Sequence, residues 1–258
     1  MIHHDWDGLT DSSAPGSPRG AAEAPGPAPR PSMNGVFVVI AAFNEERTVG
    51  AAVRGVRERV ANVVVVDDGS ADRTACEAGA AGATVLRHLI NRGQGAALKT
   101  GITYALGLGA EVIVTFDSDG QHQPEDLDTL VAPLRGGGVD VVLGSRFLDR
   151  GTRVPPVRWI TLKLGIVFTR IVSRIRVTDV HNGLRAFTRE AVQRMNLHED
   201  RMAHASEILD EISRLGLRYR EVPTRILYTD YSRQKGQQST AAVRIALDFL
   251  LGKLGKGH

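Results

Sequence analysis

The chain has a single cysteine, few aromatic residues and no long apolar run in its 258 residues. One cysteine, Cys76, cannot form an internal disulfide, so a secreted disulfide scaffold and a cysteine-built zinc site are both excluded. No stretch approaches the roughly 18 apolar residues that cross a bilayer, so we expect no transmembrane helix. Aromatic residues make up 5% of the chain. That is too few for a surface that stacks bases, and we expect no nucleic-acid partner.

The first 34 residues differ in composition from the rest. They hold six of the eleven prolines and four glycines, and they show no apolar periodicity. This composition predicts a disordered tail over residues 1–34. The tail also lacks the apolar core of a secretory signal. We expect one folded domain over residues 35–240, followed by an amphipathic helix and tail over 241–258.

Short apolar runs alternate with segments of helical spacing in this domain. The runs cover residues 36–41, 62–66, 83–86, 111–116 and 139–144, and helices are predicted over 45–60, 71–81, 95–108, 124–134 and 203–215. Apolar runs that are continuous indicate strands buried on both faces. The pattern predicts an α/β fold with a mostly parallel central sheet and helices on both faces. Ligands of such sheets lie beyond the carboxyl ends of the strands.

Polar residues follow each of the five predicted strands. These segments are Ala42–Glu46, Asp67–Ser70, His88–Gly95, Asp117–His122 and Gly144–Arg146. One such segment alone is explained by helix capping, and capping remains the preferred interpretation for Ser70 and Asp72. Five in succession at one edge of the sheet favour a binding site.

The acidic segment after the fourth strand carries the clearest chemistry. Asp117, Asp119 and Gln121 are spaced two residues apart and offer oxygen ligands for a hard cation, Mg²⁺ or Mn²⁺. The alternative is that Asp119 and Gln121 cap the next helix. Gly93 and Gly95 open a helix and bring backbone amides toward an anion, or they form only a tight turn. Neither a Walker loop nor a full dinucleotide fingerprint is present.

These segments occur in the same order in glycosyltransferase family 2, which the chain resembles over residues 35–240. The most similar members are the polyprenyl-phosphate (dolichyl-phosphate) mannose and glucose synthases. The matching runs are Ala41–Glu45, Val66–Ser70, Asn91–Leu98, Asp117–Pro124, Gly144–Arg146, Thr178–Arg185 and Tyr231–Gln237. The resemblance implies a GT-A fold and an inverting, metal-dependent transfer of a hexose. It further implies a nucleotide-diphosphate sugar as the donor and a polyprenyl phosphate in the membrane as the acceptor.

The resemblance also assigns roles to individual residues. Those matching the nucleotide-sugar site are Ala41, Phe43, Glu45, Asp67, Asp68, Asp117, Ser118, Arg233 and Lys235. Asp117, Asp119 and Gln121 match the metal site. Arg146 and Arg158 match the positions that hold the acceptor phosphate, and surface salt bridges are their alternative role.

The acceptor decides whether a general base is needed. A phosphomonoester has a second pKa of about 6, so it is already ionised at neutral pH, and two arginine forks suffice to hold it. An alcohol acceptor needs a base. Asp179 is the candidate base, or it is a structural partner of Arg185 or His181. We therefore assign catalysis to Asp119, Arg146 and Asp179.

Charge patterning predicts membrane contact. Residues 151–178 contain six basic residues and no acidic one, interleaved with apolar side chains. This is typical of a basic amphipathic helix in the membrane interface, and residues 242–254 are a second candidate. The alternative for both is packing on the core. We expect a cytoplasmic protein bound peripherally at the inner face of the cell membrane, with a small membrane partner protein as a further possibility.

Other functions and residues stay open at this point. A phosphohydrolase that uses Asp117 fits poorly, because the motif follows the fourth strand instead of the first. A non-catalytic nucleotide-sugar-binding protein and a transferase with a soluble or alcohol acceptor are the remaining alternatives. Glu207 is either catalytic or a buried paired carboxylate. The histidines His88, His122, His181 and His204 lack metal-ligand spacing, and we predict turn or surface positions for them.

Overall fold

A computed structural model describes residues 32–149, 159, 166, 175–201 and 203–227. Arg158, Arg233 and Lys235 lie outside these residues, as do nearly all of the predicted tail, most of the basic segment 151–178 and all of residues 241–258. The elements are β1 (Val36–Ala42), α1 (Val49–Arg57), β2 (Asn62–Asp67), α2 (Thr74–Ala80), β3 (Thr84–Arg87), α3 (Gln94–Gly107), β4 (Val112–Asp117), α4 (Asp126–Arg135), β5 (Val141–Ser145), β6 (Arg185–Thr188), α6 (Arg189–Arg194), α7 (His204–Leu215) and β7 (Tyr219–Pro223).

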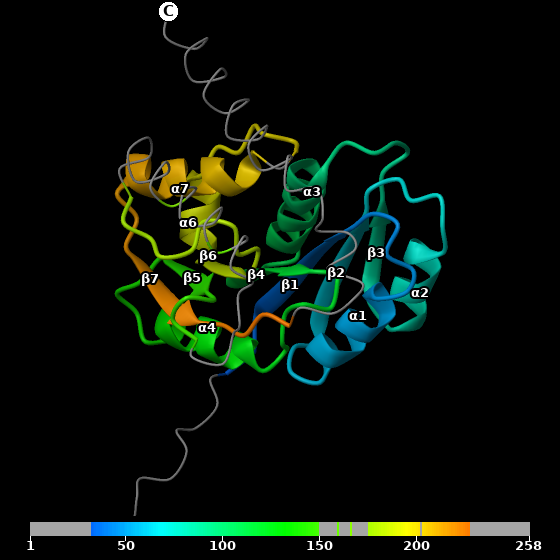
Figure 1. Ribbon diagram of the computed structural model, residues 1–258, viewed down its shortest axis with the longest axis horizontal. Helices are drawn as coiled ribbons and strands as arrows, with labels where there is room; N and C mark the ends of the chain where they lie inside the picture. Colours follow the sequence, from blue (N-terminus) through cyan, green and yellow to red (C-terminus); the bar gives the residue numbers. More distant parts are fainter. Residues whose placement is uncertain (1–31, 150–158, 160–165, 167–174, 202, 228–258) are drawn as a thin grey trace, which may run out of the picture.

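The strands form one seven-stranded sheet in the order β3-β2-β1-β4-β6-β5-β7 (Figure 1). Strands β1 to β4 pair in parallel, and so do β5 and β7. Strand β6 is antiparallel to both of its neighbours, β4 and β5. The predicted α/β fold with a mostly parallel sheet is therefore confirmed.

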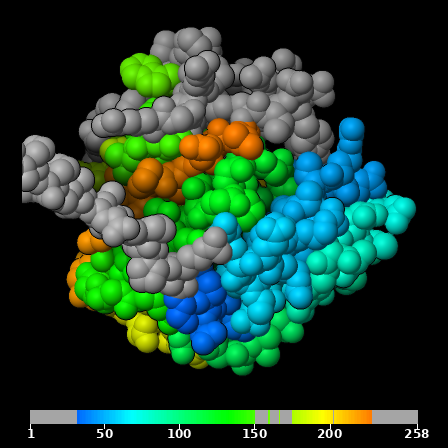
Figure 2. All heavy atoms as spheres, turned by 90° about the horizontal axis from the view of Figure 1, so that it is seen from below, coloured from blue at the N-terminus to red at the C-terminus, as the bar shows by residue number. Residues whose placement is uncertain are grey.

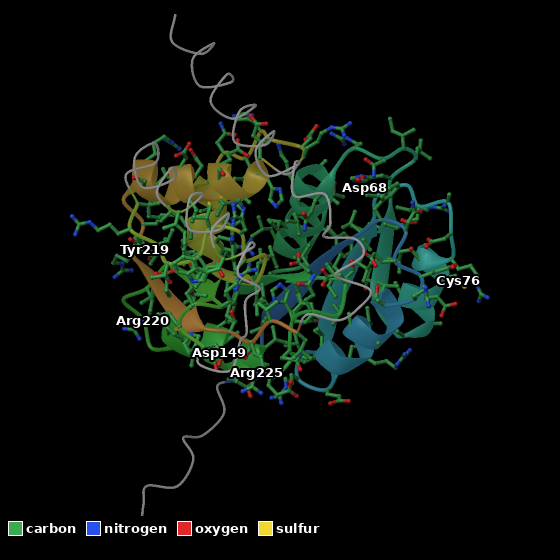
Figure 3. All side chains as sticks on the ribbon, in the orientation of Figure 1. Asp68, Cys76, Asp149, Tyr219, Arg220 and Arg225 are labelled. Carbon is green, nitrogen blue, oxygen red and sulfur yellow. The ribbon has the colours of Figure 1, made fainter. Side chains whose placement is uncertain are left out.

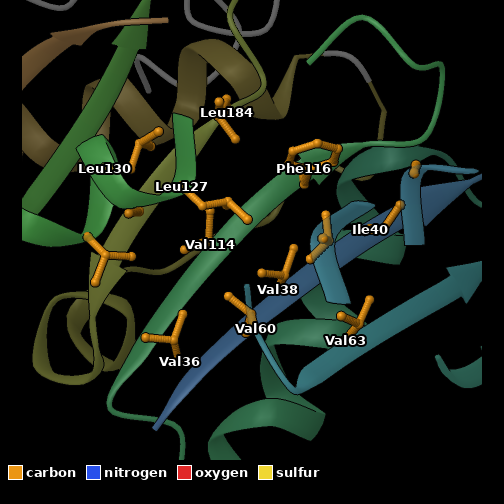
Figure 4. Packing of buried hydrophobic residues seen from close by; sticks show 14 of the residues in the cluster. Val36, Val38, Ile40, Val60, Val63, Val114, Phe116, Leu127, Leu130 and Leu184 are labelled. Atoms are coloured by element: carbon orange, nitrogen blue, oxygen red, sulfur yellow. The ribbon is translucent and has the colours of Figure 1, made fainter. Parts of the chain in front are cut away.

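Helices cover both faces of the sheet. Helices α1, α2 and α4 pack on one face, and α3, α6 and α7 pack on the other (Figure 1). Strand β1 shows why: Val36, Val38 and Ile40 belong to the first core cluster, whereas Phe37 and Val39 belong to the second. Figure 4 shows the first three beside side chains of β4 and α4. Successive strand residues point to opposite faces, so a strand covered on both sides is continuously apolar.

Two strands and one helix were not predicted. Strands β6 (RAFT) and β7 (YREVP) mix charged and apolar residues, and α6 has only six residues. None of the three carries a periodic signal of useful length. The predicted helix 45–60 also begins later, at Val49, because the Glu45 carbonyl accepts hydrogen bonds from the N–H groups of Thr48 and Val49 in a preceding turn.

Part of the basic segment packs on the core. Ile166 and Ile175 are each 3% exposed and belong to the second core cluster, with Val177. Trp159, by contrast, is 47% exposed. Two apolar side chains of the predicted interface helix, those of Ile166 and Ile175, are therefore buried inside the protein.

The topology creates a crevice at the carboxyl ends of β1 and β4. From β1 the chain builds outward to β2 and β3, and it then returns to place β4 on the other side of β1. Ala41 of β1 pairs with Asp117 of β4, and the Ser118 hydroxyl donates to the Ala41 carbonyl at 3.2 Å. Figure 2 shows the first part of the domain, in blue and cyan, lying beside the green and orange later segments. A reversal of strand order of this kind is where ligands of α/β sheets bind.

A glycine pair in α3 tests how closely this helix lies on the sheet. A Cβ on Gly101 would lie 2.4 Å from Val39 Cγ1, whereas a Cβ on Gly107 meets nothing within 4 Å. We expect Gly101→Ala to lower the free energy of unfolding by about 1–3 kcal/mol, because overpacking outweighs its helix propensity. Gly107→Ala is the control and should leave stability unchanged or raise it. Urea unfolding compares the two, and equal midpoints would contradict the close packing.

Candidate active site

Asp117 ends β4 and lies directly against the backbone of the segment before β6. A Cβ on Gly183 would come within 2.5 Å of both Asp117 carboxylate oxygens, so only glycine leaves room for this carboxylate. Oδ1 accepts a hydrogen bond from Gln94 Nε2 at 3.2 Å, and Oδ2 lies 2.8 Å from His122 Nε2. The side chain is nevertheless 29% exposed. Asp117 is thus fixed from three sides and open on one.

Asp119 forms a local turn with Gln121. Its Oδ1 accepts the Gln121 N–H at 3.0 Å, and its Oδ2 accepts the side-chain amide at 2.5 Å. Helix α4 begins at Asp126, and its N-cap, Glu125, makes no side-chain cap hydrogen bond. The interpretation of Asp119 and Gln121 as helix caps is therefore wrong. The turn instead keeps the Asp119 carboxylate at the crevice next to Asp117.

The two carboxylates have opposite pKa shifts. Burial acts to raise the pKa of Asp117, but the hydrogen bond and charge of His122 and the charge of Arg185 outweigh it, so the pKa lies below its ordinary value. Burial and the negative charge of Asp117 hold the pKa of Asp119 above its ordinary value. A divalent cation shared by the pair would relieve this repulsion.

The donor set fits such a cation. Among the described residues, no group of three or more His, Cys, Asp or Glu side chains is arranged to hold a metal ion. Mg²⁺, however, is usually bound by one or two carboxylates together with substrate phosphates. Asp117 and Asp119 supply that number, and the Gln121 amide offers a third oxygen.

The segment after β7 runs beside these residues. Ile226 forms an isolated antiparallel bridge with His122, and the Leu227 N–H donates to the Gln121 carbonyl at 2.9 Å. Leu227, the last residue that the structure describes, therefore lies next to the acidic segment. Arg233 and Lys235 follow shortly after in the sequence.

The predicted nucleoside residues lie at the ends of β1 and β2. Phe43 is 42% exposed, whereas Glu45 is buried and its carboxylate accepts from the Thr48 hydroxyl at 2.8 Å. Asp67 is buried, accepts from the Ser70 N–H at 3.0 Å, and lies 3.1 Å from Arg87 Nε. The exposed Phe43 ring and the buried acids thus share one edge of the sheet.

Asp68 holds the loop between β3 and α3. Its carboxylate lies 2.7 Å from His88 Nδ1 and accepts the N–H groups of Arg92 and Gly93 at 3.0 and 2.6 Å. Asp68 is labelled in Figure 3. These three partners, all residues of the protein itself, give Asp68 a structural role in this loop. A role for Asp68 in binding a base or ribose remains a prediction.

Gly93 and Gly95 serve close packing. A Cβ on Gly93 would lie 2.4 Å from the Asp200 carbonyl oxygen, and one on Gly95 would lie 2.1 Å from that of Glu199. The Ala96 N–H donates to the Asp200 carbonyl at 3.0 Å. Of the two interpretations left open by the sequence, the structure favours the tight turn.

Arg146 follows β5 and is bound to Asp179. Its Nε and its backbone N–H donate to the same Asp179 oxygen, at 2.6 and 3.1 Å, and both residues are 4% exposed. Glu221 of β7 supports this pair from behind, because its carboxylate accepts from the N–H groups of Thr178 and Asp179 at 2.7 and 3.3 Å. The structure thus joins two predicted site residues, and the other Asp179 oxygen, Oδ1, accepts the His181 N–H at 3.3 Å, so a structural role beside His181 is also present.

A cavity of about 100 Å³ lies beside Asp117, between α3, the segment before β6 and the start of α7. Its lining includes the polar residues Gln94, Thr115, Asn182, Arg185 and His204 and the apolar residues Leu98, Ala205 and Ile208. Asp117 is the predicted site residue among the described lining residues, whereas the others, Gln94 and His204 included, were not predicted as site residues.

The prediction of turn or surface positions is wrong for His204, which begins α7 and is buried, whereas His122 lies in the segment between β4 and α4 but is also buried. His122 and His204 are 5% and 7% exposed. His204 begins α7 and shares a buried stripe with Ile208 and Ile212, so helical spacing could have identified it. Glu207 accepts the N–H groups of His198 and Glu199 at 2.7 and 2.9 Å, as a structural carboxylate does.

The sequence pattern that defines Glycosyl transferase family 2 matches residues 37–195, which include β1 to β5 and the whole acidic segment. The chain belongs to this family. It is a glycosyltransferase, as the motifs predicted. The strand order with one antiparallel strand, β6, and the likeness to a solved structure of the same architecture confirm the GT-A fold.

Two relatives cover most of this family 2 chain. A UDP-N-acetylglucosamine-dolichyl-phosphate N-acetylglucosaminyltransferase of Methanococcus voltae is 30% identical over 243 residues, covering 86% of this chain and 97% of its own. A polyprenol monophosphomannose synthase of Mycolicibacterium smegmatis is 31% identical over 196 residues, covering 72% and 73%. Glucosyl-3-phosphoglycerate synthase from Mycobacterium tuberculosis, solved with Mg²⁺ and uridine diphosphate, superimposes with a TM-score of 0.63 at 22% identity, covering 83% and 78%.

Burial of His204 predicts a pH dependence of stability. Burial and the charge of Arg185 lower its pKa from 6.5 to about 4, against the raising effect of its hydrogen bond to the Arg201 carbonyl. Between these two pH values the unfolded state binds a proton that the folded state does not. The free energy of unfolding should therefore fall by up to about 3 kcal/mol as the pH drops from 6.5 to 4.

A variant without the imidazole isolates this contribution. His204→Asn should show a shallower decrease of unfolding free energy over the same pH range, because the other titrating groups are unchanged. Chemical unfolding at several pH values measures both slopes. Parallel curves for the two proteins would contradict a neutral, buried His204.

Proposed function

We propose that this family 2 enzyme transfers a hexose, with inversion, from a nucleotide-diphosphate sugar to a polyprenyl phosphate at the membrane surface, with Mg²⁺ or Mn²⁺. One observation supports the proposal most directly: two carboxylates and a buried arginine follow strands at the same edge of the sheet. The carboxylates of Asp117 and Asp119 lie at the end of β4, and Arg146, held by Asp179, follows β5. The relatives named for dolichyl phosphate and polyprenol support the lipid acceptor.

The donor end of the site has to stabilise a leaving diphosphate. A cation held by Asp117, Asp119 and Gln121 supplies positive charge where negative charge develops. Gln94 and His122 keep the Asp117 carboxylate in one orientation through its two oxygens. Ser118, bonded to the Ala41 carbonyl, ties the acidic segment to the nucleoside side of the crevice.

Arg233 and Lys235 are within reach of this charge. Arg233 is six residues beyond Leu227, whose N–H is bonded to the Gln121 carbonyl. Six residues span at most about 20 Å. The proposal gives these two basic side chains the role of holding the diphosphate.

The acceptor end has to hold a second anion without a general base. Arg146 offers a planar guanidinium that pairs with phosphate oxygens in a fork. Asp179 occupies its Nε, so this carboxylate orients the arginine. In this assignment Arg146 and Arg158 bind the lipid phosphate, and Asp179 is a positioning residue instead of a base.

The membrane attachment is part of the proposal. No helix in the described part of the chain is long and apolar enough to cross a bilayer. We assign membrane contact to the basic segment 151–178 and to residues 242–254, with the enzyme at the cytoplasmic face. Trp159, 47% exposed, is the described residue of these segments best suited to an interface.

The first test removes one metal ligand. Asp119→Asn should reduce transfer at least about 100-fold, because the cation loses a charged ligand, while the melting temperature stays the same. Product is identified by mass after incubation with a panel of nucleotide sugars and polyprenyl phosphate, with Mg²⁺, Mn²⁺ or a chelator. Glu125→Gln, which removes an exposed carboxylate from the neighbouring segment, is the control. Normal turnover of Asp119→Asn, or of the chelated enzyme, would exclude the metal.

The second test separates acceptor binding from base catalysis. Arg146→Lys keeps the buried charge but loses the fork, and it should raise the acceptor KM about 10- to 100-fold with little change in the donor KM. Asp179→Asn should follow the same pattern if it orients Arg146. A large loss of kcat in Asp179→Asn at an unchanged acceptor KM would instead make Asp179 a base and the acceptor an alcohol.

A further inference from the structure

The cavity beside Asp117 contains a histidine that the transfer mechanism does not use. His204 is 7% exposed and lines this cavity of about 100 Å³. Asp117 lines the same space, so the cavity opens next to a carboxylate proposed to hold the cation at the diphosphate. In a nucleotide-diphosphate sugar, the sugar is attached to the terminal phosphate of that diphosphate. This inference therefore rests on the proposed function.

The two nitrogens of His204 have different roles. Nδ1 lies 2.7 Å from the Arg201 carbonyl oxygen. A carbonyl can only accept, so Nδ1 carries the hydrogen. The lowered pKa of His204, about 4, keeps the ring neutral at physiological pH. Nε2 is then a hydrogen-bond acceptor, and it has no hydrogen-bond partner in the described part of the chain.

Neighbouring polar groups of the cavity are already bonded within the protein. Asn182 donates to Thr224 Oγ1 at 2.9 Å and accepts the Leu184 N–H at 3.0 Å. The Thr115 hydroxyl donates to the Gly183 carbonyl at 2.6 Å. These bonds shape the wall of the cavity, whereas Nε2 of His204 remains available to a ligand.

Arg185 is also committed to the wall. Its guanidinium donates to the carbonyls of Asn182, Ala205 and Val180 at 3.1, 3.2 and 3.1 Å. These bonds join the turn before β6 to the start of α7. His204 is thereby held next to a buried cation, which disfavours a second positive charge on its ring.

We propose that His204 is a specificity-determining residue of the donor site, whose Nε2 accepts a hydrogen bond from one hydroxyl of the transferred sugar. A sugar presents hydroxyl donors at its edge and C–H groups on its faces. The cavity can offer both kinds of contact, because its lining combines the polar side chain of His204 with the apolar side chains of Leu98 and Ile208. A donor that lacks the hydroxyl leaves a buried acceptor unpaired, and such a site rejects it.

A matched pair of substitutions separates the two nitrogens. His204→Asn places an amide N–H near Nδ1 and can keep the bond to the Arg201 carbonyl, but it loses the acceptor at the Nε2 position. His204→Gln extends its amide to the Nε2 position and retains an acceptor there. Calorimetry on each variant gives the dissociation constants of the nucleotide sugar and of the matching nucleoside diphosphate.

The ratio of these two constants is the decisive quantity. His204→Asn should weaken binding of the nucleotide sugar about 3- to 10-fold, with binding of the nucleoside diphosphate unchanged. His204→Gln should stay close to the original protein. A series of donors that each lack one hydroxyl should show a loss at one position, and His204→Asn should remove that loss.

Three outcomes overturn the inference. They are equal weakening of both ligands in His204→Asn, identical behaviour of the two variants, and deoxy donors that bind as tightly as the full sugar. Failure of the proposed function gives a different result, because the original protein then binds no nucleotide sugar at all. Matching melting temperatures of the variants at neutral pH exclude a general loss of folding.

Discussion

The position of one carboxylate, that of Asp117, governs the geometry of the site. It lies at the end of β4, at the point where the strand order reverses, and it rests on the backbone of Gly183. Gln94 from α3 and His122 from the acidic segment each hold one of its oxygens. Three parts of the fold thus converge on a single side chain. The cavity lined by His204 lies beside this carboxylate, and Asp119 is close enough for the charge of Asp117 to raise its pKa.

Buried and partly buried charges are the main electrostatic feature of this site. Asp117 is close enough to Asp119 for its charge to raise the Asp119 pKa, and Arg185 is buried nearby and donates to three backbone carbonyl groups. At the end of β5, Arg146 and Asp179 form a buried pair supported by Glu221. A pair of this kind is weak evidence for stability. It does fix the direction of the guanidinium, which is what recognition of a phosphate requires.

The sequence was sufficient for the main strands and for the acidic segment. Valine-rich runs such as 62–66 are typical of strands buried on both faces. All five predicted strands are present. Strands β6 and β7 could not be predicted, because their stability comes from pairing with β4 and β5 and not from their own composition. Likewise, the role of Gly183 depends on a contact with Asp117, 66 positions earlier in the chain (183 − 117), which no local pattern reveals.

Local ambiguity explains the remaining errors. The glycines at 93 and 95 suit an anion-binding turn and a close helix contact equally well, and only the carbonyls of Glu199 and Asp200 distinguish the two. His204 was placed at the surface because a single histidine has no strong burial preference. Its position one turn before Ile208 on α7 is the signal that corrects this.

The reversed direction of β6 has a consequence for how such sites can change. In a fully parallel sheet, only the segments that leave strands reach the ligand edge, so every binding group comes after a strand. Here the segment that enters β6, residues 178–184, reaches the same edge from the opposite direction. Contacts at this edge can therefore be contributed by stretches of chain that run in opposite directions, and one stretch can be remodelled through mutation while the other keeps its geometry.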